Sequence, residues 1–276
     1  MASLLALAAA LCWGASDFLG GVASRRLAVL TVLVVSQAVG LAGVVLWVLV
    51  AHDPVPGLSE LIPAALAGVA GLVGLGALYR GLAIGAMGIV APISAASPLV
   101  PLAVDTTRGL VPGEVQWLGV ALVLAGITAL ALEPTGDGRV ASGVGLALVA
   151  ALGFGLFFVG LDAGADESAP WAVVAARTAS VSIAAATALL VTRTSLRPPR
   201  TLLPLLVAVG VFDTGANVLV AFASTKEAAG LVAVLGALYP LVTVVLARVV
   251  LGERLSAGRR VAGVVALAGA ALVAAG

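Results

Sequence analysis

Long apolar runs fill this chain, and they constrain its fold more than any other feature. A helix needs about 20 predominantly apolar residues to cross a hydrocarbon core about 30 Å thick. Ten segments come close to that length, and short breaks rich in arginine, proline and glycine separate many of them. We therefore predict ten spans, at residues 4–23, 27–50, 61–82, 87–104, 115–132, 140–161, 169–191, 202–223, 228–250 and 258–275.

The composition points to the same environment. Hydrophobic residues make up 62% of the chain and charged residues only 10%, whereas a soluble domain is about 45–50% apolar. The strands of a membrane barrel would alternate over roughly ten residues, and these runs do not alternate. The expected class is an all-α integral membrane protein. A net charge of +1 leaves no basic surplus for binding nucleic acid.

The sequence also contains an internal repeat. Residues 88–100 read GIVAPISAASPLV and residues 230–242 read GLVAVLGALYPLV, with the Pro-Leu-Val triplets aligned. Further out, Gln37 matches Arg177, so the first five predicted spans correspond to the last five. We predict two five-helix repeats, at 1–133 and 140–276. Because five is odd, the second repeat is expected to be inverted, which places a binding site near the midplane between them.

Ionisable side chains within the spans give the strongest indication of such a site. A charge at the centre of a membrane helix costs about 2.5–3.5 kcal/mol, so it should face protein or water. Asp213 lies near the middle of its span, with Asn217 one turn later on the same face. Arg177 in the preceding span is expected at nearly the same depth in the membrane as Asp213, with a difference of about 5 Å. We predict that Asp213 lines a cavity, either paired with Arg177 or sharing a solute with it. An ion pair that only locks two helices is the competing interpretation.

Other residues are predicted to line the same cavity because of their polarity, their aromatic rings or their place in the repeat. Asp17 shares a helix face with Trp13, and Pro98 and Pro240 each remove a backbone donor, which frees carbonyl groups for other partners. Packing is the competing interpretation for the aromatic and serine side chains. The additional candidate solute-binding residues are Trp13, Asp17, Gln37, Ser94, Ser97, Phe154 and Tyr239.

The duplicated order of these features resembles the drug/metabolite transporter superfamily, EamA type. The resemblance rests on Trp13-Gly14 in the first span, the Pro98 and Pro240 spans, and the turn at 251–255 before a glycine-rich last span. It implies a ten-helix carrier in the inner membrane of a bacterium, which moves amino-acid-like or drug-like solutes, usually outward, through a site between the halves. The family carries no signature that names the solute.

Other functional classes lack the residues that their chemistry requires. The single histidine, His52, falls in a predicted loop, and neither a His-Glu-x-x-His motif nor paired acidic clusters occur. We therefore expect no enzyme activity, no catalytic residues, no metal and no cofactor. Two alternatives stay open: a proton-coupled multidrug exporter with Asp213 or Asp17 as the proton carrier, and a non-transport membrane scaffold. The expected partners are a small solute, membrane lipid and, for the coupled exporter, protons. The chain would act as a monomer or homodimer.

The sequence gives two conflicting predictions for the orientation of the chain in the membrane. The resemblance implies that both termini are cytoplasmic. That orientation leaves only Arg108 and Lys226 in the cytoplasmic connections, while most of the arginines fall in the outer ones. Because cytoplasmic loops normally carry the excess of Lys and Arg, the charge distribution favours termini on the outside.

Overall fold

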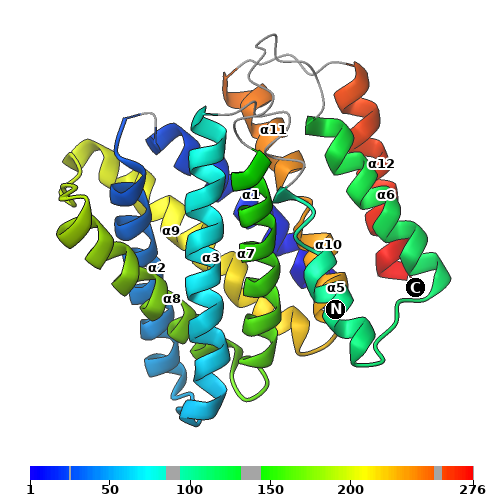
Figure 1. Ribbon diagram of the computed structural model, residues 1–276, viewed down its shortest axis with the longest axis horizontal. Helices are drawn as coiled ribbons and strands as arrows, with labels where there is room; N and C mark the ends of the chain where they lie inside the picture. Colours follow the sequence, from blue (N-terminus) through cyan, green and yellow to red (C-terminus); the bar gives the residue numbers. More distant parts are fainter. Residues whose placement is uncertain (25, 85–93, 132–143, 252–256, 276) are drawn as a thin grey trace.

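The computed structural model describes residues 1–24, 26–84, 94–131, 144–251 and 257–275, and every regular element within them is helical (Figure 1). Six of these helices are long and apolar enough to cross a membrane, and shorter apolar helices accompany them. The predicted all-α membrane class is therefore confirmed. The elements are α1 (Ala2–Ser24), α2 (Val29–Ala51), α3 (Leu58–Ile84), α5 (Leu99–Thr107), α6 (Glu114–Ala131), α7 (Val144–Ala163), α8 (Ala169–Ala186), the π-helix η1 (Thr187–Val191), the 3-10 helix η2 (Arg200–Leu202), α9 (Leu203–Ser224), α10 (Ala229–Gly236), α11 (Tyr239–Leu251) and α12 (Ala257–Ala275). The start of the predicted fourth span at Met87 and most of the turn at 251–255 lie outside the described residues.

Local sequence explains where several helices begin and end. The Ser168 hydroxyl accepts a hydrogen bond from the backbone N–H of Trp171 at 3.4 Å, and Pro170 follows in the first turn of α8. Both are preferred at helix starts, because the N-terminal N–H groups have no partner within the helix. At the other end of α2, His52 adopts a left-handed backbone, with φ of 55°, that closes the helix. His52 is exposed at this helix end, which confirms its predicted loop position.

The predicted ninth span, at 228–250, is two helices rather than one. Helix α10 ends at Gly236, and α11 begins at Tyr239 with Pro240 in its first turn. Proline cannot donate to the carbonyl four residues earlier, and it disfavours a helical backbone in the residue before it. The first repeat breaks in the matched place, since a turn at 95–98 precedes α5. Both breaks are therefore positioned by the prolines that the repeat aligns, Pro98 and Pro240.

Helix contacts between the two halves occur in matched pairs, in which equivalent helices of the two halves exchange places. Helix α3 packs along α7, and α1, the match of α7, packs along α9, the match of α3. Contacts of α3 with α8 and of α2 with α9 form a second matched pair, and α6 packs along α12. Figure 1 shows α3 beside α7 at the centre of the view, with α6 and α12 together at one edge. The packing of the helices thus follows the repeat in the sequence.

Small residues make the close helix contacts possible. A methyl group on Gly14 would lie 2.7 Å from the carbonyl oxygen of Tyr239, and one on the matched Gly155 would lie 2.8 Å from that of Ser97. Gly68 likewise approaches the backbone of Ala176, and Gly210 that of Ser36. Lipid tails are as apolar as leucine, so membrane helices associate through such close backbone packing rather than through apolar burial.

Gly68 offers a direct test of this packing, with a matched control on the same helix. We expect Gly68→Ala to destabilise the protein by about 1–3 kcal/mol, because the added methyl overlaps the Ala176 backbone. Gly76→Ala should be neutral or slightly stabilising, since nothing lies within 4 Å of its added methyl and alanine favours helix over glycine. Thermal unfolding of both variants in detergent measures the difference. Equal melting temperatures for the two variants would contradict the packing described here.

Candidate functional site

A cavity lies between the halves, and side chains from both repeats line it. Its volume is about 100 Å³, counted as the space open to the centre of a water-sized sphere. One water needs roughly 10–15 Å³ on that measure, so the cavity can hold a small organic molecule. Ser94 is fully buried and is not among the lining residues. The predicted site residues that line the cavity are Trp13, Asp17, Gln37, Ser97, Phe154, Arg177, Asp213, Asn217 and Tyr239.

An ion pair joins α8 to α9 in this cavity. Nη2 of Arg177 donates to Oδ2 of Asp213 at 2.5 Å. The Arg177 side chain is 8% exposed and that of Asp213 is 21% exposed, so the pair is largely desolvated but borders the cavity. Of the two arrangements that the sequence predicts for these residues, pairing is the one observed. Removing one partner from such a pair is costly, because the remaining charge is only partly solvated.

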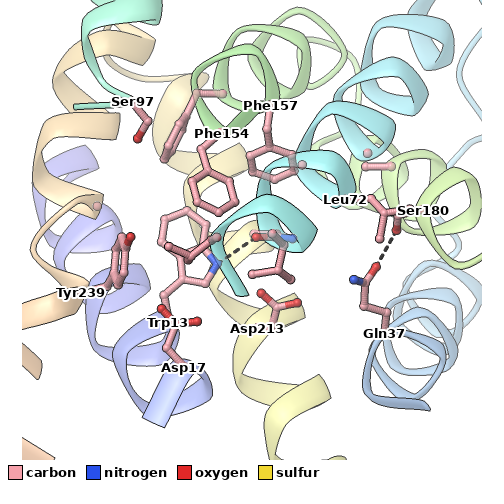
Figure 2. A pocket seen from close by; sticks show the side chains of 18 of the residues that line it. Trp13, Asp17, Gln37, Leu72, Ser97, Phe154, Phe157, Ser180, Asp213 and Tyr239 are labelled. Atoms are coloured by element: carbon pink, nitrogen blue, oxygen red, sulfur yellow. Dashed lines mark hydrogen bonds between the residues drawn. The ribbon is translucent and has the colours of Figure 1, made fainter. Parts of the chain in front are cut away.

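Trp13 and Asn217 form a second link, within the cavity wall. The indole Nε1 of Trp13 donates to the side-chain oxygen of Asn217 at 3.1 Å, which ties α1 to α9 (Figure 2). The Trp13 ring also meets Phe158 edge to face, with centroids 5.7 Å apart. Because one edge of the indole is held by a hydrogen bond and the ring by an aromatic contact, the orientation of Trp13 is fixed within the cavity wall.

Gln37 takes part in a third link, between α2 and α8. Its side-chain oxygen accepts from the hydroxyl of Ser180 at 2.6 Å (Figure 2), and Ser180 also contacts the backbone oxygen of Arg177. Sequence reasoning missed Ser180, although it lies one turn after Arg177 and shares its helix face. The matched positions Gln37 and Arg177 therefore border one cavity from opposite halves, each held by its own partner.

Asp17 differs from the other charged groups of the cavity. It makes no hydrogen bond or ion pair with any residue that the structure describes. It borders the main cavity and also a smaller one of about 20 Å³, which Gln37 and Asp213 share. In Figure 2 the carboxylates of Asp17 and Asp213 lie below the Trp13 ring, and the rings of Phe154 and Phe157 lie above it. Sequence reasoning missed Phe157 and Phe158, although Phe158 is the match of Asp17 in the repeat.

The turn before α5 and the turn between α10 and α11 both open onto the cavity. Ser97 lies in the turn before α5, while Gly236, Ala237 and Tyr239 surround the break between α10 and α11, and all four line the cavity. Backbone that leaves a helix at membrane depth is tolerated where protein buries it or a cavity solvates it. Discontinuous helices at the interface of two repeats are typical of solute sites in secondary transporters.

The fold and site define a multi-pass helical membrane protein whose related halves enclose a charged cavity. The family model of the EamA-like transporter family matches residues 1–132 and again residues 141–275, so the chain belongs to this family of the drug/metabolite transporter superfamily. A solved crystal structure of a protein aligns over 98% of this chain and 95% of its own, with 19% identity and a TM-score of 0.79, which shows a shared fold. A search of curated proteins found no match.

The pair of Arg177 and Asp213 should be coupled energetically, and a double-mutant cycle measures the coupling. Arg177→Gln should destabilise the protein by about 1–3 kcal/mol, because it leaves Asp213 without its charged partner. The double variant with Asp213→Asn should cost less than the sum of the single ones, by at least about 0.5 kcal/mol. Unfolding by SDS in mixed micelles gives these values.

A second pair in the same chain serves as the control for that cycle. Arg108 lies 3.3 Å from Asp162, with side chains that are 46% and 19% exposed. Solvent screens such a pair, so its coupling should be small, about 0–1 kcal/mol. A coupling for Arg177 and Asp213 that is no larger than that of the control pair would show that the cavity pair is not desolvated.

Proposed function

We propose that this protein carries small organic solutes across the membrane by alternating access, with the solute held in the cavity between the halves. The observation that supports it is that matched positions of the two repeats border one cavity, and both helix breaks reach it. In a carrier of this design, one half rocks against the other around a central site. Membership of a transporter family fits this proposal.

The finer architecture is part of the proposal. Ten transmembrane helices would form two inverted five-helix repeats, 1–133 and 140–276, in the plasma membrane of a bacterium. The direction would be outward, and the solutes amino-acid-like or drug-like, as the family resemblance implies. Lipid surrounds the apolar exterior, where many large apolar side chains are exposed. The chain would work as a monomer or a homodimer.

Each predicted site residue that lines the cavity has a proposed role. The ionic and polar groups of Asp213, Arg177 and Asn217 would bind the polar part of the solute. The aromatic rings of Trp13, Phe154 and Tyr239 would contact its apolar part. Gln37, Asp17 and Ser97 complete the lining, and Ser94 is left out because it does not reach the cavity.

Coupling to protons is the second candidate, and one feature favours it. Two carboxylates, Asp17 and Asp213, border the same cavity, and only Asp213 has a cationic partner within the described residues. A carboxylate that faces a cavity at membrane depth can exchange a proton as access alternates between the two sides. No comparable feature favours a scaffold, which would need no charged cavity.

Asp213→Asn tests the transport proposal. The solute is first identified by comparing metabolites in cells with and without the protein, and its uptake is then measured in proteoliposomes. We expect the initial rate to fall at least about tenfold, because the variant loses the charge-assisted contact that holds Arg177 in the cavity, worth about 1.5–3 kcal/mol. Glu227→Gln, which changes an exposed carboxylate outside the cavity, should leave the rate unchanged.

Two outcomes of this experiment would be decisive. Normal transport by a correctly inserted Asp213→Asn variant would remove Asp213 from the site. Uptake by the unmodified protein that ignores an imposed pH gradient would exclude proton coupling and leave the uncoupled carrier.

A further inference from the structure

Two of the helix pairs that line the cavity differ in their chemistry. One wall is the packed pair α1 and α9, which contributes Trp13, Asp17, Asp213 and Asn217. The other wall is the packed pair α3 and α7, whose lining residues are glycine, leucine and phenylalanine. Figure 2 shows the carboxylates on one side of the cavity and the Phe154 and Phe157 rings on the other.

The repeat shows that equivalent positions of the two halves form these two walls and carry different residues. Gly68 and Gly210 make matching contacts with the backbones of Ala176 and Ser36, which fixes the correspondence of α3 with α9. By that correspondence Asp213 matches Gly71, and Asn217 matches Leu75.

The correspondence of α1 with α7 gives the same result. Gly14 and Gly155 make matching contacts with the chain at Val242 and Val100, respectively, and Asp17 then matches Phe158. All three matched pairs, Asp213 with Gly71, Asn217 with Leu75 and Asp17 with Phe158, line the cavity. The polar member always belongs to the wall of α1 and α9, and the other member to the wall of α3 and α7.

The acidic and basic side chains of the cavity are unequal in number. Two carboxylates and one guanidinium line it, and Arg177 is already paired with Asp213. The surplus is the carboxylate of Asp17, which has no partner among the described residues and lies one turn from the Trp13 ring. An anionic solute that used the remaining N–H donors of Arg177 would face the carboxylates of both Asp213 and Asp17. A cation would gain a carboxylate without breaking any existing contact.

A bare metal ion does not fit this cavity. Hard cations take six or more oxygen ligands, and the described residues contain no group of three or more His, Cys, Asp or Glu side chains that could hold one. The opposite wall offers phenyl rings and aliphatic side chains, which bind apolar groups and the faces of organic cations.

From these observations we propose that the cavity selects an amphipathic organic cation, an amine or ammonium group on an apolar or aromatic body. The cationic group lies against Asp17 beside Trp13, and the body packs against Phe154, Phe157 and Phe158. This assignment rests on the proposed transport function and specifies the solute class of the same site.

Three probes with one shared body test the assignment on the full chain in nanodiscs. They are 2-phenylethylamine, L-phenylalanine and 3-phenylpropionate, which carry a cationic, a zwitterionic and an anionic group on a phenylalkyl body. Titration calorimetry should show the amine binding at least about tenfold more tightly than either other probe, as one charge-assisted contact predicts. Phenylalanine or phenylpropionate binding as tightly as the amine overturns the assignment, as does binding of none of the three.

Two variants separate the charges of the site. Asp17→Asn should remove the preference for the amine. Asp213→Asn, which frees Arg177, should shift the preference toward phenylpropionate by about tenfold. Asp162→Asn removes a carboxylate of α7 that does not line the cavity and should change neither preference. If Asp17→Asn does not fold, the change in probe preference of Asp213→Asn still tests the assignment. Absence of that change would overturn the assignment.

Failure of this assignment can be told apart from failure of the transport proposal. If another class of solute is bound and carried into proteoliposomes, the chain is a carrier and only the solute class is wrong. If the amine binds with the expected selectivity but nothing is carried, the solute class holds and the transport proposal fails.

Discussion

A charge inside a membrane bundle must find a partner or a polar cavity, and the centre of this protein follows from that constraint. Arg177 on α8 and Asp213 on α9 are each other's charged partner. Trp13 with Asn217, and Gln37 with Ser180, do the same for neutral polar groups. These three links join α1, α2, α8 and α9 around one space, so the polar residues that are costly in lipid also define where a solute can be held.

Duplication supplies the frame in which those links can form. Glycines at matched positions let the backbones of opposite halves approach closely, and the prolines that the repeat aligns lie at a turn that borders the cavity in each half. The packing has kept the symmetry of the repeat, whereas the lining of the cavity has diverged from it. A symmetric frame with an asymmetric interior can give a solute one preferred orientation, with its charged and apolar parts on different walls.

Much of this could be predicted from the sequence, because membrane helices and repeats leave simple signals. The run lengths predicted an all-α membrane protein, and the repeat register predicted that Gln37 and Arg177 occupy matched positions of the two halves. Helical depth alone predicted that Arg177 and Asp213 could pair. Ser94 shows the limit of such reasoning: it falls in a span predicted to be continuous at 87–104, but the chain turns at 95–98. Apart from Phe154, the residues of the apolar wall were also missed, because an apolar side chain that faces a cavity looks the same in sequence as one that faces lipid.

The central claim is that one cavity, bordered by both halves, opens alternately to the two sides of the membrane. A single cysteine at Leu75, which lines both the main and the smaller cavity, tests it most directly in a chain whose only native cysteine is replaced by Cys12→Ala. A membrane-impermeant maleimide should label this site from either face of the membrane, and a transported solute should slow the labelling. Labelling from one face only, with no protection by any solute, would contradict alternating access through this cavity.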